Sequence, residues 1–203
     1  MTGLPNPPPA DPLPLAERWL NEAQATVPKN PWAMALASAS DGGQPSVRYV
    51  LLKSLSTTGG SLVFFTNYGS RKATELDAGR GAAGALYWPD AGRQLRFEGQ
   101  VERTTAAVSD AYFASRPRPS QLNAWASEQS RPIAGPRQMA ERLDAWEAKF
   151  ANAETIPRPA GWGGYQLQIQ SVEFWIEGAD RLHERLRYER AAPGNWSAIW
   201  LQP

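Results

Sequence analysis

Apolar residues recur along most of the chain in short segments that turn-forming residues separate. Apolar or alternating segments bounded by glycine, proline, asparagine or aspartate are typical of β-strands. Some of the links, such as Asp41-Gly42-Gly43, have the length and composition of hairpin turns, which favours antiparallel pairing. On this basis strands are predicted at Ala33–Ser38, Val47–Lys53, Ser61–Thr66, Ala82–Trp88, Arg93–Glu102, Tyr165–Gln170, Val172–Ile176, Leu186–Arg190 and Ala198–Leu201.

Helical spacing of apolar residues is found between and before these strands. Leu15, Trp19 and Leu20 fall on one face of a helix predicted at Leu15–Gln24. Four more helices are predicted at Ser70–Asp77, with the Ser70 hydroxyl as N-cap, and at Thr105–Ala114, Ser120–Ala126 and Pro136–Ala151. Many short strands with inserted helices predict an α+β fold built on an antiparallel barrel.

The domain organisation follows from the same pattern. No internal repeat or linker interrupts residues 14–203, so we expect one domain there. Residues 1–13 carry five prolines and predict a flexible N-terminal arm. Residues Met1–Pro14 contain no apolar core of signal-peptide length, so we expect a cytoplasmic protein.

Composition narrows the classes of function. The 21 basic and 20 acidic residues nearly balance, so no global field draws the chain to nucleic acid or to a membrane. Cysteine is absent, which excludes disulfides, thiol nucleophiles and thiolate metal ligands. With a single histidine as well, we expect no metal site.

That histidine, His183, stands between Arg181 and Arg185 in a segment of aromatic and charged residues. Two flanking guanidinium groups oppose protonation of the imidazole and suit an anionic ligand. A surface strand with ordinary ion pairs is the alternative interpretation.

A first candidate anion site is Gly69-Ser70-Arg71-Lys72. Two cations in the first turn of a helix oppose the helix dipole, and no acidic residue in that turn offsets them. A phosphate bound there would explain both. Arg48 and Lys53 lie five residues apart on a nearby strand and face opposite sides if the strand is regular. The alternative is a solvated basic surface.

A second candidate anion site combines Tyr112 and Arg116, four residues apart on one helix face, with Ser120, which is predicted to cap the next helix. The alternative is a cap beside a surface arginine. The stretch Gly79–Gly84 matches the glycine pattern of dinucleotide-binding folds, but a helix precedes it and a strand follows it, so we interpret it as a turn.

Together these segments resemble the pyridoxine (pyridoxamine) 5′-phosphate oxidase family from about Ala10 to Pro203. The matching motifs are Arg48–Lys53, Phe64–Asn67, Gly69–Lys72, Arg93–Arg96, Tyr112–Gln121, Ala124–Ser127, Gln129-Ser130, Trp162–Tyr165 and Glu173–Arg185. The resemblance implies a split β-barrel homodimer with peripheral helices and an FMN at each of two sites built from both subunits.

The resemblance also assigns residues to roles. The FMN ligands would be Arg48, Lys53, Phe65, Thr66, Arg71, Lys72, Gln94, Gln129, Ser130, Trp175 and Arg185. The substrate phosphate would bind to Lys53, Tyr112, Arg116 and Ser120, and the candidate catalytic residues Arg181 and His183 would lie over the substrate ring. The implied reaction oxidises pyridoxamine or pyridoxine 5′-phosphate to pyridoxal 5′-phosphate with dioxygen, giving hydrogen peroxide.

Two departures from the family pattern leave alternatives open. Residues 1–13 lack the Arg-x-x-Tyr that folds over the site in many members, and Trp200 replaces the arginine of the usual Arg-Leu-x-Pro ending. A related branch, the flavin oxidases of phenazine biosynthesis, shares the Pro8–Pro12 entry and acts on a tricyclic aromatic. A protein that binds FMN or pyridoxal phosphate without turnover is the alternative of another class.

Overall fold

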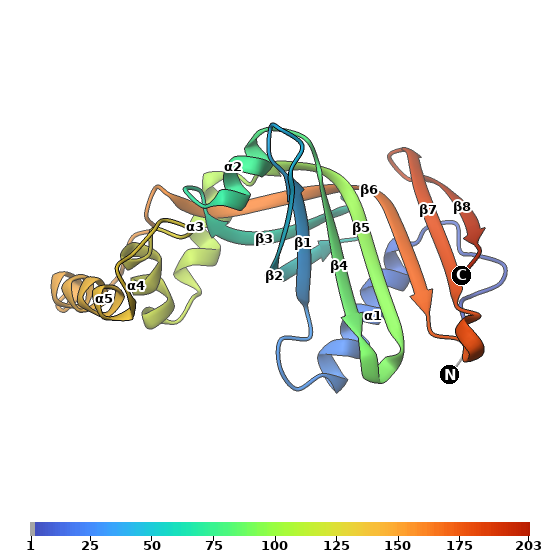
Figure 1. Cartoon of the computed structure of the whole chain (residues 1–203), viewed down its shortest axis with the longest axis horizontal. Coiled ribbons are helices and arrows are strands. Elements are labelled where there is room, and N and C mark those ends of the chain that lie inside the picture. The colour runs from blue at the N-terminus through green and yellow to red at the C-terminus, as the bar shows by residue number, and fades with distance from the viewer. Residues whose placement is uncertain (1–2) are drawn as a thin grey trace.

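A computed structural model describes residues 3–203 and contains one eight-stranded antiparallel sheet (Figure 1). Its order is β3-β2-β1-β4-β5-β6-β7-β8, and β3 also pairs with β6, which closes the first six strands into a barrel. This arrangement confirms the predicted α+β antiparallel split barrel. The strands are β1 (Ala33–Ala39), β2 (Pro45–Ser56), β3 (Ser61–Asn67), β4 (Ala82–Trp88), β5 (Arg93–Arg103), β6 (Trp162–Ile176), β7 (Glu184–Ala192) and β8 (Asn195–Leu201).

Strand β6 organises the molecule because it belongs both to the barrel and to the β7–β8 extension. Residues 162–168 pair with β3, and residues 171–176 pair with β7, while β5 accompanies the strand along its length. The two strands predicted at Tyr165–Gln170 and Val172–Ile176 are therefore one. The pairing of β5 with β6 shifts register between Glu98 and Gly99, so that Gln170 has no partner on β5. Strands β5 and β6 stay paired on both sides of this bulge. Only glycine fits at position 99, because a Cβ there would lie 1.9 Å from the Gln168 carbonyl oxygen.

The helices pack at two places. Helix α1 (Leu13–Thr26) buries the predicted apolar face against the barrel, where Trp19 meets Phe174 edge-to-face at 5.1 Å. Helices α3 (Ala106–Ala114), α4 (Arg118–Ala126) and α5 (Pro136–Phe150) gather at the opposite end from β7 and β8 (Figure 1). They surround a small second core of Phe113, Leu122, Ile156 and Trp162.

Two predicted helix caps are wrong. Helix α2 spans Arg71–Asp77, but the Ser70 hydroxyl donates to the Asn67 carbonyl at 2.7 Å and makes no cap hydrogen bond. Helix α4 begins at Arg118, directly after Pro117, so Ser120 lies within its first turn and does not cap it. Proline is favoured at a helix start, and the Pro117-Arg118-Pro119 run moves that start forward.

Residues 3–12 form no strand and no helix, as expected of an arm, but they contact the barrel. Leu4 is buried in the main core, and its N–H donates to the Glu184 carboxylate at 2.7 Å. The Tyr188 hydroxyl donates to the Pro9 carbonyl at 3.1 Å. Within residues 3–203 no helix has the length and hydropathy needed to cross a membrane.

Candidate functional site

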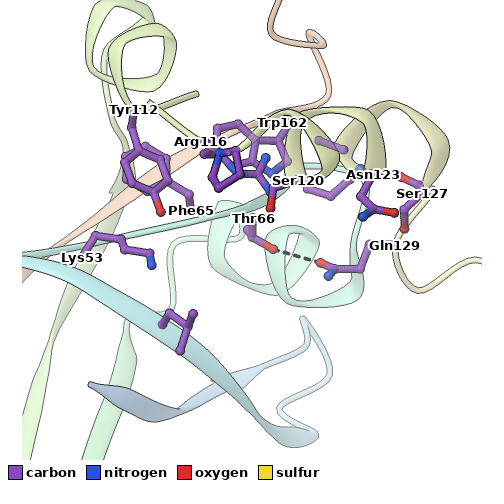
Figure 2. Close-up of a pocket in the computed structure, with 14 residues that line it drawn as sticks. Lys53, Phe65, Thr66, Tyr112, Arg116, Ser120, Asn123, Ser127, Gln129 and Trp162 are labelled. Carbon is purple, nitrogen blue, oxygen red and sulfur yellow. Dashed lines mark hydrogen bonds between the residues drawn. The ribbon is translucent and has the colours of Figure 1, made fainter. Parts of the chain in front are cut away.

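A cavity of about 520 Å³ lies between the β2–β3 hairpin and helices α3 and α4 (Figure 2). Four of its lining residues are those predicted to bind a substrate phosphate, and three more belong to the predicted FMN set. The lining consists of Leu51, Lys53, Phe65, Thr66, Asn67, Tyr112, Arg116, Pro117, Ser120, Asn123, Ala124, Ser127, Gln129 and Trp162. The cavity therefore joins chain segments that are far apart in sequence.

Arg116 is the most informative group in this cavity. Its Nη1 is buried without a hydrogen-bond partner in the described chain, and its guanidinium lies over the Trp162 ring at 4.6 Å. Burial lowers the pKa of Arg116, and the neighbouring Tyr112 only partly opposes this. A guanidinium stays charged even so, and a buried unpaired donor is costly. The geometry thus suits an anion that would accept the free N–H.

An aromatic stack holds Arg116 and Tyr112 in place. The Phe65 ring lies parallel to Tyr112 at 4.0 Å and to Trp162 at 5.5 Å. Lys53 approaches the same stack, with its ammonium 5.7 Å from the Tyr112 ring centre. Side chains fixed by such packing lose little entropy when a ligand binds.

Lys72 lies behind the cavity wall and is only 8% exposed. Its ammonium donates to Gln129 Oε1 at 2.7 Å and to Thr66 Oγ1 at 3.1 Å, and both of these partners line the cavity. No carboxylate of residues 3–203 forms a salt bridge with it. Burial and, to a smaller extent, Arg48 lower the pKa of Lys72, Glu75 partly opposes them, and the resulting pKa is about 8. A buried ammonium with neutral partners is a second group that an anion would stabilise.

Arg48 and Arg71 lie outside the cavity lining, where they share one partner. Glu75 accepts from Arg48 Nη2 at 2.9 Å and from Arg71 Nε at 2.8 Å. The first turn of α2 holds no acidic residue, as expected, but Glu75, one turn further along the helix, pairs with Arg71. Arg48 and Lys53 do point to opposite faces of β2, with Lys53 alone in the cavity.

Apart from Ser130, the remaining predicted residues form a second group at the far end of the sheet. Gln94 pairs with Trp175, which pairs with Arg185 on the next strand. The His183 ring lies 4.6 Å from the Trp175 ring, and its Nδ1 accepts the Gly178 N–H at 3.2 Å. Arg181 is exposed and has a φ of +64°, in the left-handed region that non-glycine residues seldom occupy.

These two groups cannot meet within one chain. Trp162 in the cavity and Trp175 in the second group stand thirteen residues apart on the single strand β6, which corresponds to roughly 40 Å of strand. Figure 1 shows α3 and α4 at one end of the molecule and β7 at the other. Ser130 lies near the first group, in the turn after α4, with a φ of +72°.

Some lining residues were not anticipated from sequence. Trp162 and Ser127 line the cavity although the family motifs that contain them gave them no role, and Asn123 lies outside the matching motifs. Glu75 could have been found, because its spacing of four from Arg71 is that of a helical ion pair.

Comparison with known proteins places the chain in a family. A model described as pyridoxamine 5′-phosphate oxidase matches residues 20–150, and one described as the pyridoxine 5′-phosphate oxidase C-terminal dimerisation region matches residues 162–203. The chain belongs to the pyridoxamine 5′-phosphate oxidase family. It is an oxidoreductase of that type.

Relatives align over nearly the whole chain. The pyridoxine/pyridoxamine 5′-phosphate oxidase of Rubrobacter xylanophilus is 45% identical over 196 residues, which cover 96% of this chain and 88% of that protein. The protein of the same name from Cupriavidus metallidurans is 47% identical, covering 95% and 89%. Among solved structures, PhzG from Burkholderia lata in complex with tetrahydrophenazine-1-carboxylic acid is 34% identical, with a TM-score of 0.87 and coverage of 97% and 94%.

Proposed function

We propose that this protein is an FMN-dependent oxidase that converts pyridoxamine 5′-phosphate or pyridoxine 5′-phosphate to pyridoxal 5′-phosphate. Dioxygen would be the electron acceptor and hydrogen peroxide the second product. The observation that carries the proposal is the half-buried Arg116 side chain, whose buried Nη1 has no partner in the described chain, in a cavity that also holds Lys53, Tyr112 and Ser120. A phosphate monoester offers several strong acceptor oxygens to such a set of donors.

The cofactor proposal rests on the donors behind the same cavity. Lys72, Thr66 and Gln129 form one hydrogen-bonded group, and the Lys72 ammonium has no carboxylate partner in the described chain. These residues fit an anionic group of FMN, with Arg48 and Arg71 adding positive charge beside them. Phe65, Gln94, Ser130, Trp175 and Arg185 complete the proposed FMN set, and Lys53 would contact both ligands. When bound, FMN supplies the two-electron acceptor chemistry, while the protein binds and orients the substrate.

Arg181 and His183 would reach the substrate from the second subunit of a homodimer. The match of residues 162–203 to a dimerisation region supports this assembly. Because His183 Nδ1 accepts a backbone N–H, a neutral imidazole carries its proton on Nε2. That proton can be donated to the phenolic oxygen of the substrate ring, with Arg181 holding the ring in place.

A phenazine-type oxidase is the second candidate, and the similarity to PhzG favours it. The carboxylate of a tricyclic acid would also find donors in this cavity. The higher identity to pyridoxine/pyridoxamine 5′-phosphate oxidases favours the first proposal.

One substrate panel separates the possibilities. Purified, FMN-loaded protein would be assayed for hydrogen peroxide with pyridoxamine 5′-phosphate, pyridoxine 5′-phosphate, unphosphorylated pyridoxamine and a reduced phenazine carboxylic acid. We expect turnover of the two phosphates and little with pyridoxamine itself. Turnover of the phenazine alone would assign the protein to the other branch. A protein that binds FMN but oxidises none of the four would contradict the proposed oxidase and indicate a binding protein.

A further inference from the structure

Glu75 is a buried carboxylate, only 4% exposed, at the junction of α2 with β1 and β2. Its Oε2 accepts from the Ser38 and Ser46 hydroxyls, each at 2.6 Å, and from Arg48, while its Oε1 accepts from Arg71. Burial would raise the pKa of Glu75, but the hydrogen bonds from Ser38, Ser46, Arg71 and Arg48 outweigh it and lower the pKa to about 2. Glu75 is thus ionised throughout the working range of an enzyme.

This carboxylate ties together two arginines from different elements. Arg48 comes from β2 and Arg71 from α2, and without Glu75 no group of the described chain would bridge them. Lys72 follows Arg71 on the same helix. Three cations and one carboxylate leave a net charge of +2, which matches the charge of about −2 on a phosphate monoester.

We propose that Glu75 is a positioning residue for the phosphate of the flavin cofactor, because it fixes the Arg48 and Arg71 guanidinium groups beside Lys72. The inference rests on the proposed function, in which these three cations hold FMN. Glu75 itself does not touch the ligand in this assignment, and it acts through the two arginines.

Geometry and charge predict opposite effects for the loss of Glu75. A carboxylate repels a phosphate, so a purely electrostatic role predicts tighter FMN binding once it is removed. A positioning role predicts weaker binding, because the two arginines lose their common anchor and must be ordered by the ligand. The sign of the change therefore decides between the two roles.

The test is a fluorescence titration of the apoprotein with FMN in wild type and three variants. Glu75→Gln removes the charge at nearly constant shape, and Glu75→Asp keeps the charge but shortens its reach. Glu141→Gln is the matched control, since Arg137–Glu141 on α5 is another Arg–Glu pair four residues apart, at 3.0 Å, but exposed. We expect at least tenfold weaker FMN binding for both Glu75 variants and no change for the control. Unchanged or tighter binding in the Glu75 variants would overturn the inference.

The pH dependence of FMN affinity is a second measurement, and a merely structural role of Glu75 would not change it. The charged groups facing Lys72 are Arg48 from β2 and Glu75 from α2, with the neutral Thr66 and Gln129 on its other side. Below about pH 8 Lys72 is protonated and attracts the phosphate, so FMN affinity in the wild type should fall as the pH rises through that value.

Glu75 favours the charged form of Lys72, so Glu75→Gln should move this fall in affinity to lower pH. An identical pH profile in both proteins would contradict the positioning of the cation cluster by Glu75. A wild type that binds no FMN at any pH would instead refute the proposed function, and this inference with it. Thermal unfolding of each variant shows that the titrations compare folded proteins.

Discussion

Arg116 shows how a single residue can favour function over stability. Its guanidinium lies half-buried over Trp162 and Phe113, and its buried Nη1 has no acceptor among residues 3–203. A charge held in this way is unfavourable until a ligand pairs with it. The aromatic contacts compensate in part, because a guanidinium stacks well on rings.

Replacing Arg116 by leucine should therefore separate binding from stability. We expect the Michaelis constant for pyridoxamine 5′-phosphate to rise about 10- to 150-fold, the loss of a charge-assisted hydrogen bond worth about 1.5–3 kcal/mol. The melting temperature of the ligand-free protein should stay the same or rise, since the buried N–H without a partner is gone. Steady-state kinetics and calorimetry measure the two quantities. A variant that loses FMN yet keeps its substrate affinity would mean that the two phosphate sites are assigned the wrong way round.

At the scale of elements, strands and long helices could be predicted because each carries its own hydrophobic pattern. Strand β4 and helix α1 illustrate this, since their buried faces follow the alternation and the helical period of the sequence. Features set by tertiary contact could not be predicted. The joining of two segments into β6, for example, depends on a register shift against β5. The start of α4 was placed too late for a local reason, because the Pro117-Arg118-Pro119 run moves it forward.

The same distinction between local and tertiary contacts decides which parts of the candidate site could be predicted. Tyr112 and Arg116 were predicted together because four residues on a helix bring side chains to one face. Glu75 was missed as the partner of Arg48 because that contact joins a strand to a helix 27 residues later. Sequence spacing reports neighbours within an element, whereas contacts between elements require the fold.

The N-terminal arm differs from its predicted flexibility because it contacts the barrel. Proline content predicts a flexible segment, yet Leu4 is buried and its N–H donates to Glu184, the residue that follows His183. Burying a leucine side chain stabilises a protein by about 2 kcal/mol, which offsets the entropy cost of ordering the one or two residues around it.

Leu4→Ala should therefore lower the stability of the whole protein by about 2 kcal/mol, a fall in melting temperature of roughly 4–8 °C. Ile133→Ala is the control, because Ile133 is 42% exposed and should leave the melting temperature nearly unchanged. Differential scanning calorimetry measures both. Equal melting temperatures for Leu4→Ala and wild type would show that the arm is as loose in solution as its composition predicts.

At the scale of the whole molecule, the proposed site would need two chains to bring its two groups of residues together. The cavity with Arg116 and the group with Arg181 and His183 occupy opposite ends of the sheet, separated by the length of β6. An isologous dimer places equivalent surfaces of two copies together, so each site would combine the first group of one subunit with the second group of its partner.

This arrangement predicts complementation between two impaired variants. Arg116→Ala and Arg181→Ala homodimers would each turn over little pyridoxamine 5′-phosphate at concentrations well below the raised Michaelis constant, because every site lacks one group. In a mixed dimer one site receives both intact groups and the other receives neither. Random assembly makes half of the dimers mixed, so co-expression should restore about a quarter of wild-type sites. Doubly tagged, purified heterodimers, with one intact site of two, should turn over pyridoxamine 5′-phosphate at about half the wild-type rate in the same assay. If the heterodimer is no more active than the parental variants, both groups act within one chain and the assembly proposed for the site is wrong.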